Sequence, residues 1–66
     1  MSTITVNGKL MQTTHHTVQL VLNELGLSVG RFAVEINGEI VPKSELPDLK
    51  ITDGMVIEVV QAVGGG

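Results

Sequence analysis

Residues 17–27 read Thr-Val-Gln-Leu-Val-Leu-Asn-Glu-Leu-Gly-Leu and contain the chain's single helical pattern. Thr17 is placed to cap the N-terminus of this helix, because its hydroxyl can accept from first-turn amides. Gly26 is placed to end it in the left-handed conformation, with Leu27 supplying an apolar contact. The pattern predicts a helix over residues 18–25, whose apolar residues recur at i, i+3, i+4 and i+7: Val18, Val21, Leu22 and Leu25.

Alternating segments on both sides of this helix read as strands. Two of them are followed by Asn-Gly pairs, which favour tight hairpin turns because both residues tolerate positive φ. Pro42 ends the short strand after the second turn, since proline cannot donate to a sheet. Residues 44–49 read as an irregular or single-turn element. The predicted strands cover residues 3–6, 9–13, 32–37, 39–41 and 55–61.

The order of these elements predicts an α+β fold. One helix lies between two hairpin-like units, and the only apolar surface available to it is one face of one mixed sheet. The first and last strands can then pair in parallel at the centre. This is the β-grasp arrangement, with a mixed sheet of about five strands packed on one helix.

The last strand has two different faces. Met55, Ile57 and Val59 share one of them, and Glu58 should face water on the other. A row of residues on the water side would lead toward the end of the chain, and a contiguous apolar row favours a docking surface for a partner protein. The predicted docking residues are Val56, Glu58, Val60 and Val63.

The sequence ends in three glycines directly after this strand. A tail without side chains can thread a narrow channel and present its terminal carboxylate to another protein's active site. We therefore expect a folded domain over residues 1–63 and a flexible tail over residues 64–66. The alternative interpretation is a frayed end with no role.

Composition excludes several other classes of protein. The chain has no cysteine, so disulfides and a thiol nucleophile are excluded. Phe32 is its only aromatic residue, and the net charge of −3 argues against nucleic-acid binding. His15 and His16 are adjacent and share no face, so we expect a solvated loop and no metal site. No signal peptide or membrane span is visible, which predicts a cytoplasmic protein. We also expect the protein to be monomeric when free.

Taken together, the turns, the helix and the tail resemble the ThiS family of sulfur-carrier proteins in thiamine biosynthesis, which are ubiquitin-like β-grasp proteins. The resemblance covers essentially the whole chain. Met55 and Lys43 depart from it, because the family usually has an acidic residue and an arginine at these places. The matching segments are residues 17–18, 24–27, 34–43 and 53–66.

The resemblance implies a function for the tail. A ThiF-like enzyme would use ATP to adenylate the carboxylate of Gly66, with Gly64 and Gly65 threading its active site. A sulfur donor system would then form a thiocarboxylate, and a ThiG-like thiazole synthase would take the sulfur. The carrier would bind no cofactor itself and would not be an enzyme, because partners do the catalysis.

Two other classes of function stay open on the residues. The chain could be a related carrier for molybdopterin or cysteine synthesis, or a ubiquitin-like modifier conjugated to proteins. It could also be a non-covalent β-grasp interaction module. Only a carrier or a modifier would gain mass at Gly66 in the presence of ATP and an activating enzyme.

Overall fold

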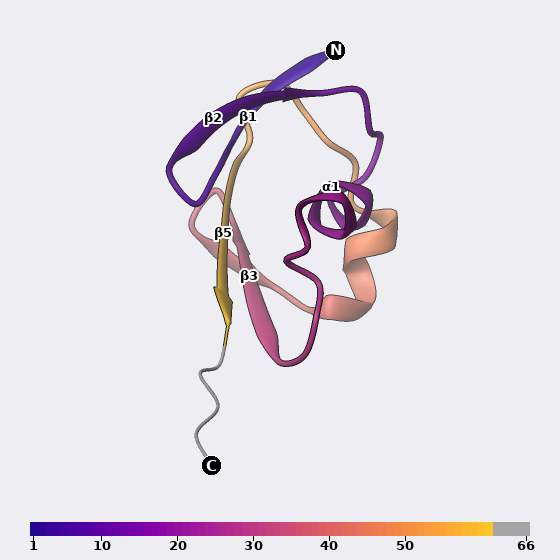
Figure 1. The fold of residues 1–66 in the computed structure, drawn as a ribbon, viewed down its shortest axis with the longest axis vertical. Coiled ribbons are helices and arrows are strands. Elements are labelled where there is room, and N and C mark those ends of the chain that lie inside the picture. Colours follow the sequence, from indigo (N-terminus) through magenta and orange to yellow (C-terminus); the bar gives the residue numbers. More distant parts are fainter. Residues whose placement is uncertain (62–66) are drawn as a thin grey trace.

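The structure is a computed structural model that describes residues 1–61. Within them, five strands form one mixed sheet in the order β2-β1-β5-β3-β4 (Figure 1). β5 lies at the centre, parallel to β1 and antiparallel to β3. The elements are β1 (Ser2–Val6), β2 (Lys9–Thr13), α1 (Val18–Leu25), β3 (Phe32–Ile36), β4 (Glu39–Val41), the 3₁₀ helix η1 (Lys43–Asp48) and β5 (Val56–Gln61).

This arrangement confirms the predicted β-grasp topology, including the parallel pairing of the first and last strands. α1 has the predicted bounds, and every strand lies within one residue of its prediction at each end. The segment after Pro42 differs, because it forms a six-residue 3₁₀ helix where the sequence indicated an irregular or single-turn element. The side chain of Leu46 is fully buried in the core, and this packing stabilises the 3₁₀ helix.

Capping fixes both ends of α1. The Thr17 hydroxyl accepts from the backbone N–H of Leu20 at 3.3 Å, as the sequence predicted. Gly26 has φ of 72°, and its N–H donates to Asn23. The Leu27 N–H donates to the carbonyl of Leu22 at 2.9 Å, which completes the left-handed cap.

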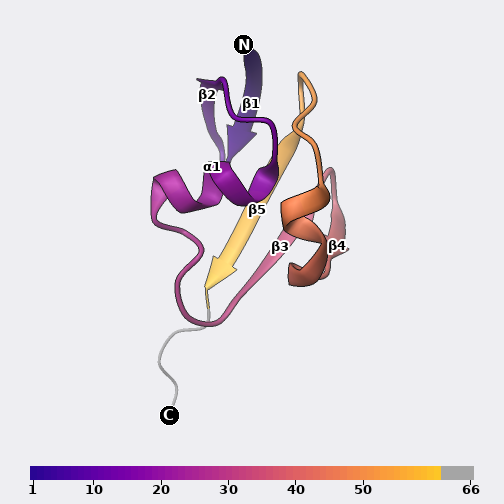
Figure 2. The same cartoon turned by 90° about the vertical axis from the view of Figure 1, so that its right-hand side faces the viewer.

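The core lies between the sheet and the two helical elements. α1 and η1 cover the same face of the sheet (Figure 2), and residues from the sheet and from both helical elements contribute to one cluster. The remaining face of the sheet carries no element of residues 1–61. The buried apolar residues are Ile4, Val6, Val18, Val21, Leu22, Val34, Ile36, Leu46, Met55, Ile57 and Val59.

The two asparagines of the Asn-Gly turns do more than turn the chain. Asn7 and Asn37 have φ of 50° and 51°, so both occupy the left-handed region predicted for them. Each side chain also accepts a hydrogen bond from β5. Asn7 Oδ1 accepts from the backbone N–H of Val59 at 2.7 Å, and Asn37 Oδ1 accepts from that of Val56 at 2.9 Å. The two turns therefore hold the central strand from opposite sides.

Replacing Asn7 by alanine should destabilise the domain by about 1–3 kcal/mol, because the partly buried N–H of Val59 would lose its acceptor. Asn7→Asp keeps an oxygen acceptor and tolerates positive φ, so it should lose much less. Denaturant unfolding of both variants measures the difference. Equal stability of Asn7→Ala and the unsubstituted chain would show that this contact does not hold β5.

Candidate functional site

β5 is the last strand in the sequence, and its two faces differ in exposure. Ile57 and Val59 point into the core, with exposed fractions of 0% and 9%. Val56 and Val60 point to solvent at 40% and 61%, and Glu58 between them is also exposed. The predicted alternation of β5 is thus confirmed, and three of the four predicted docking residues share one surface. Val63 and the glycines at 64–66 lie outside the described residues.

The neighbouring strands enlarge this surface. In the register of β3 and β5, Ala33 lies opposite Val60 and Glu35 lies opposite Glu58. Ile40 on β4 lies opposite Glu35 and is 74% exposed. We call the surface formed by Val56, Glu58, Val60, Ala33, Glu35 and Ile40 the outer face.

Sequence reasoning missed the contribution of β3 and β4 to the outer face. A signal for it was present, because a two-residue Asn-Gly turn fixes the register of a hairpin. That register pairs Ile36 with Glu39 and Glu35 with Ile40. Since Ile36 faces the core, Glu35 and Ile40 must face outward.

The end of β5 is joined to the loop between α1 and β3. Gln61 pairs with Phe32, and its side-chain amide donates to the carbonyl of Leu27 at 3.4 Å. Lys43 Nζ lies 4.2 Å from the centre of the Phe32 ring and 3.5 Å from the carbonyl oxygen of Gly30. Phe32 and Leu27 therefore contact the last residue of β5, and Lys43 packs on Phe32.

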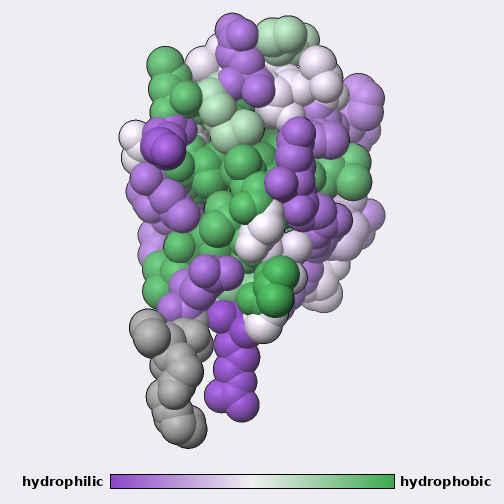
Figure 3. All heavy atoms as spheres, in the orientation of Figure 1, coloured by the Kyte–Doolittle hydropathy of each residue, from purple (hydrophilic) through white to green (hydrophobic). Residues whose placement is uncertain are grey.

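A second apolar surface lies on the helix side of the molecule. Figure 3 shows apolar side chains gathered between the β1–β2 hairpin and α1. They border an open groove of about 640 Å³ that no residue of β5 lines. None of the six residues that define the outer face lines this groove. Its lining residues are Val6, Asn7, Lys9, Leu10, Met11, Leu25 and Leu27.

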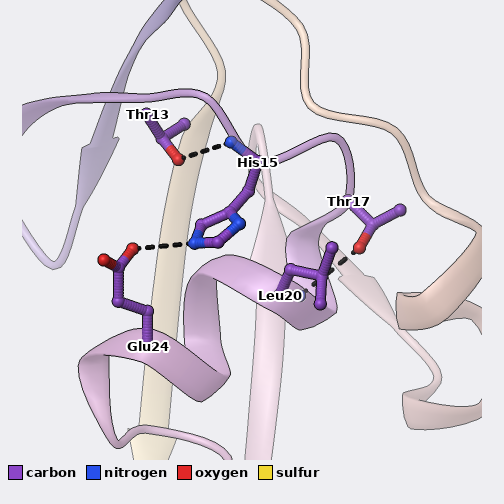
Figure 4. Close-up of polar contacts among 5 residues, drawn as sticks. All are labelled: Thr13, His15, Thr17, Leu20 and Glu24. Carbon is purple, nitrogen blue, oxygen red and sulfur yellow. Dashed lines mark hydrogen bonds and ion pairs between the residues drawn. The ribbon is translucent and has the colours of Figure 1, made fainter.

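The two histidines lie in the loop between β2 and α1, as expected, but His15 also contacts the helix. His15 Nε2 lies 2.9 Å from Glu24 Oε1 on α1, and the His15 backbone N–H donates to the Thr13 hydroxyl at 3.0 Å (Figure 4). His15 is only partly exposed, whereas His16 is exposed as predicted. His15 thus connects the loop before α1 to the surface of the helix, and neither His15 nor Glu24 belongs to the outer face.

Residues 1–61 contain no group of three or more histidine, cysteine or acidic side chains that could hold a metal ion. Over the same residues, no helix has the length and apolar character needed to cross a membrane. The candidate functional site of the described residues is the outer face, which includes β5.

Comparison with known proteins identifies the family. The family model described as the ThiS family matches residues 4–66. The sulfur carrier protein ThiS of Thermus thermophilus is 36% identical over 61 residues, which cover 92% of this chain and 95% of that protein. The chain belongs to the ThiS family.

A thiazole synthase of Paramagnetospirillum magneticum also contains a similar segment. The identity is 46% over 50 residues, which make up 76% of this chain but only 15% of that protein. The chain thus matches a small part of this relative.

Two solved structures of one protein share the fold. The crystal structure of thiamine biosynthesis protein ThiS from Geobacter metallireducens superposes with a TM-score of 0.79 at 28% identity, covering 97% of this chain and 99% of that one. The solution structure of a thiamine biosynthesis protein from the same organism gives a TM-score of 0.71, with 97% and 87% covered. These likenesses agree with the ubiquitin-like β-grasp topology of the sheet.

Proposed function

We propose that this member of the ThiS family is a sulfur carrier of thiamine biosynthesis and that it carries the sulfur on the carboxylate of Gly66. The observation that carries the proposal is the family match over residues 4–66, which extends through the three glycines. The curated relative from Thermus thermophilus is itself named a sulfur carrier protein. The described fold supports the proposal, because its central strand leads toward these glycines.

The chemistry requires activation of the terminal carboxylate. A carboxylate is ionised at neutral pH and is a poor electrophile, because its charge repels nucleophiles. Its oxygen would attack the α-phosphorus of ATP, forming an acyl-adenylate and releasing pyrophosphate. A sulfur nucleophile at the oxidation level of sulfide would then attack the acyl carbon, and AMP would leave. The product is a thiocarboxylate on Gly66.

The partners follow from these steps. A ThiF-like enzyme would bind ATP and catalyse adenylation, and a sulfur donor system would supply the nucleophile. The chain itself would be a carrier and not an enzyme, in line with the name of its curated relative. Such ATP-dependent chemistry would take place in the cytoplasm.

A ThiG-like thiazole synthase would consume the sulfur. The similar segment within a thiazole synthase supports this link, because it places a carrier-like sequence in the same polypeptide as the proposed acceptor. The same finding favours thiazole formation over the molybdopterin or cysteine pathways. The family match likewise favours a carrier over a non-covalent interaction module.

The outer face would be the docking surface for the activating enzyme. An enzyme that takes up the tail must contact the residues that precede it, and β5 precedes it directly. Val56 and Val60 are the exposed apolar residues of this strand, and Val63 would extend the same row. Binding energy at such surfaces is concentrated in a few buried apolar anchors.

Deleting Gly66 should abolish adenylation while leaving the domain folded. The deletion moves the terminal carboxylate by about 3.5 Å, roughly one extended residue, which removes it from the reacting phosphorus. ATP–pyrophosphate exchange catalysed by the ThiF-type enzyme measures the effect, and thermal unfolding provides the control. Persistent exchange with the shortened chain would exclude Gly66 as the reacting residue.

Val60→Asp should weaken binding to the activating enzyme by at least tenfold, because it would bury an unpaired charge in the interface. Its effect on folding should be small, since Val60 is 61% exposed.

Val59→Asp is the matched control, because Val59 belongs to the core and its replacement should destabilise the domain by more than about 3 kcal/mol. Calorimetric titration and thermal unfolding of both variants separate the two effects. A stable Val60→Asp chain that binds like the unsubstituted chain would place the docking surface elsewhere.

A further inference from the structure

Two glutamates lie opposite each other at the centre of the outer face. Glu35 on β3 and Glu58 on β5 are directly opposed in the antiparallel register. The Asn37 N–H donates to the carbonyl of Val56 at 2.8 Å, so the alternation of the ladder makes Glu35 and Glu58 a hydrogen-bonded pair. Their Cα atoms are then about 5.5 Å apart and their side chains lie on the same surface.

No cation of this chain accompanies the pair. Among residues 1–61, the single close contact between a basic and an acidic side chain joins His15 and Glu24 of α1. Lys43 is placed over the Phe32 ring. Residues 62–66 contain no basic side chain in the sequence, so the rest of the chain supplies none either.

Like charges directly opposite each other destabilise an antiparallel pair of strands. The two glutamates therefore weaken the contact between β3 and the central strand in the free protein. A cation placed between them would convert this repulsion into two attractive contacts. Arginine suits the position better than lysine, because its planar guanidinium presents donors in several directions and can bond to two carboxylates at once.

Apolar residues surround the two carboxylates. Val56 and Val60 precede and follow Glu58 on the same face of β5, and Ile40 lies beside Glu35. A protein surface that covered these residues would exclude water around the glutamates. Electrostatic contacts are stronger in such an environment than at an open surface.

We propose that the outer face binds a surface of the adenylating enzyme that presents an arginine between Glu35 and Glu58, flanked by apolar side chains. This inference rests on the proposed function, since it specifies the partner's chemistry at the same docking surface. The adenylating enzyme is the partner chosen because β5 leads from Glu58 toward Gly66, the residue that this enzyme must reach. The net charge of −3 would also steer the carrier toward a basic surface.

The test uses the full chain with Glu35→Gln, Glu58→Gln and both changes together, titrated with the ThiF-type enzyme of the same organism at several salt concentrations. Each single change should raise the Tm by roughly 1–5 °C, because it removes the repulsion. It should also weaken binding about tenfold or more and flatten the dependence of Kd on salt.

Glu39→Gln is the matched control. Glu39 pairs with Ile36 and so projects from the opposite face of the same hairpin. It should leave the Tm nearly unchanged, and it should change the Kd by less than about twofold, as expected for a substitution outside the interface.

Glutamine variants that are more stable yet bind with unchanged affinity would overturn the proposal, as would an equal loss of affinity in Glu39→Gln. A loss of affinity for the thiazole synthase alone would overturn the assignment to the adenylating enzyme. ATP–pyrophosphate exchange with the unsubstituted chain tests the proposed function separately. If that exchange occurs while the glutamine variants bind normally, only the present inference fails.

Discussion

The hydrogen bonding of one central strand organises the whole domain. β5 pairs with β1 on one side and with β3 on the other, and without it the sheet would separate into two hairpins. Asn7 and Asn37 strengthen this arrangement, because each supplies a side-chain acceptor to a backbone N–H of β5. The N–H of Val59 is partly buried and would be costly to leave without a partner, so the Asn7 contact should contribute more to stability than the exposed contact of Asn37. The inner face of the same strand then supplies Ile57 and Val59 to the core.

The central position of β5 also explains how a small domain can combine a stable core with an exposed surface. The inner side of β5 is committed to packing against α1 and η1, whereas the outer side is free of any element of residues 1–61. Substitutions on the outer side are therefore expected to have little effect on the core. Glu35 and Glu58 lie on this outer side, where the proposed partner would meet them. In the proposed function, stability and recognition would thus depend on opposite faces of one strand.

Much of the fold could be predicted from the sequence, because local signals and global topology agree. The period of α1, its Thr17 and Gly26 caps and the two Asn-Gly turns each specify their own segment. The burial of Leu46 and the order of η1 could not be predicted, because no periodic pattern marks a short 3₁₀ segment that depends on tertiary packing. The outward row of β5 followed from the charge of Glu58, but Glu35 and Ile40 were missed. The Asn37-Gly38 turn indicates that they face outward, but their position beside Glu58 depends on the pairing of β3 with β5, which a pass along single segments does not reveal. The asparagine contacts to β5 were missed for the same reason, as one of them joins residues 52 positions apart.

The central place of β5 also determines when the domain can form. A chain is synthesised from its N-terminus, so the segments of both hairpins are complete before the strand that joins them has been synthesised. The sheet can close only once Gln61 has emerged, and the parallel contact with β1 then has to bridge almost the full length of the domain. Contacts between residues so distant in sequence slow folding, because the entropy of closing the long loop is lost before they form. Until then the edges of β1 and β3 lack their partner, so the nascent chain is most prone to aggregation before its last strand docks.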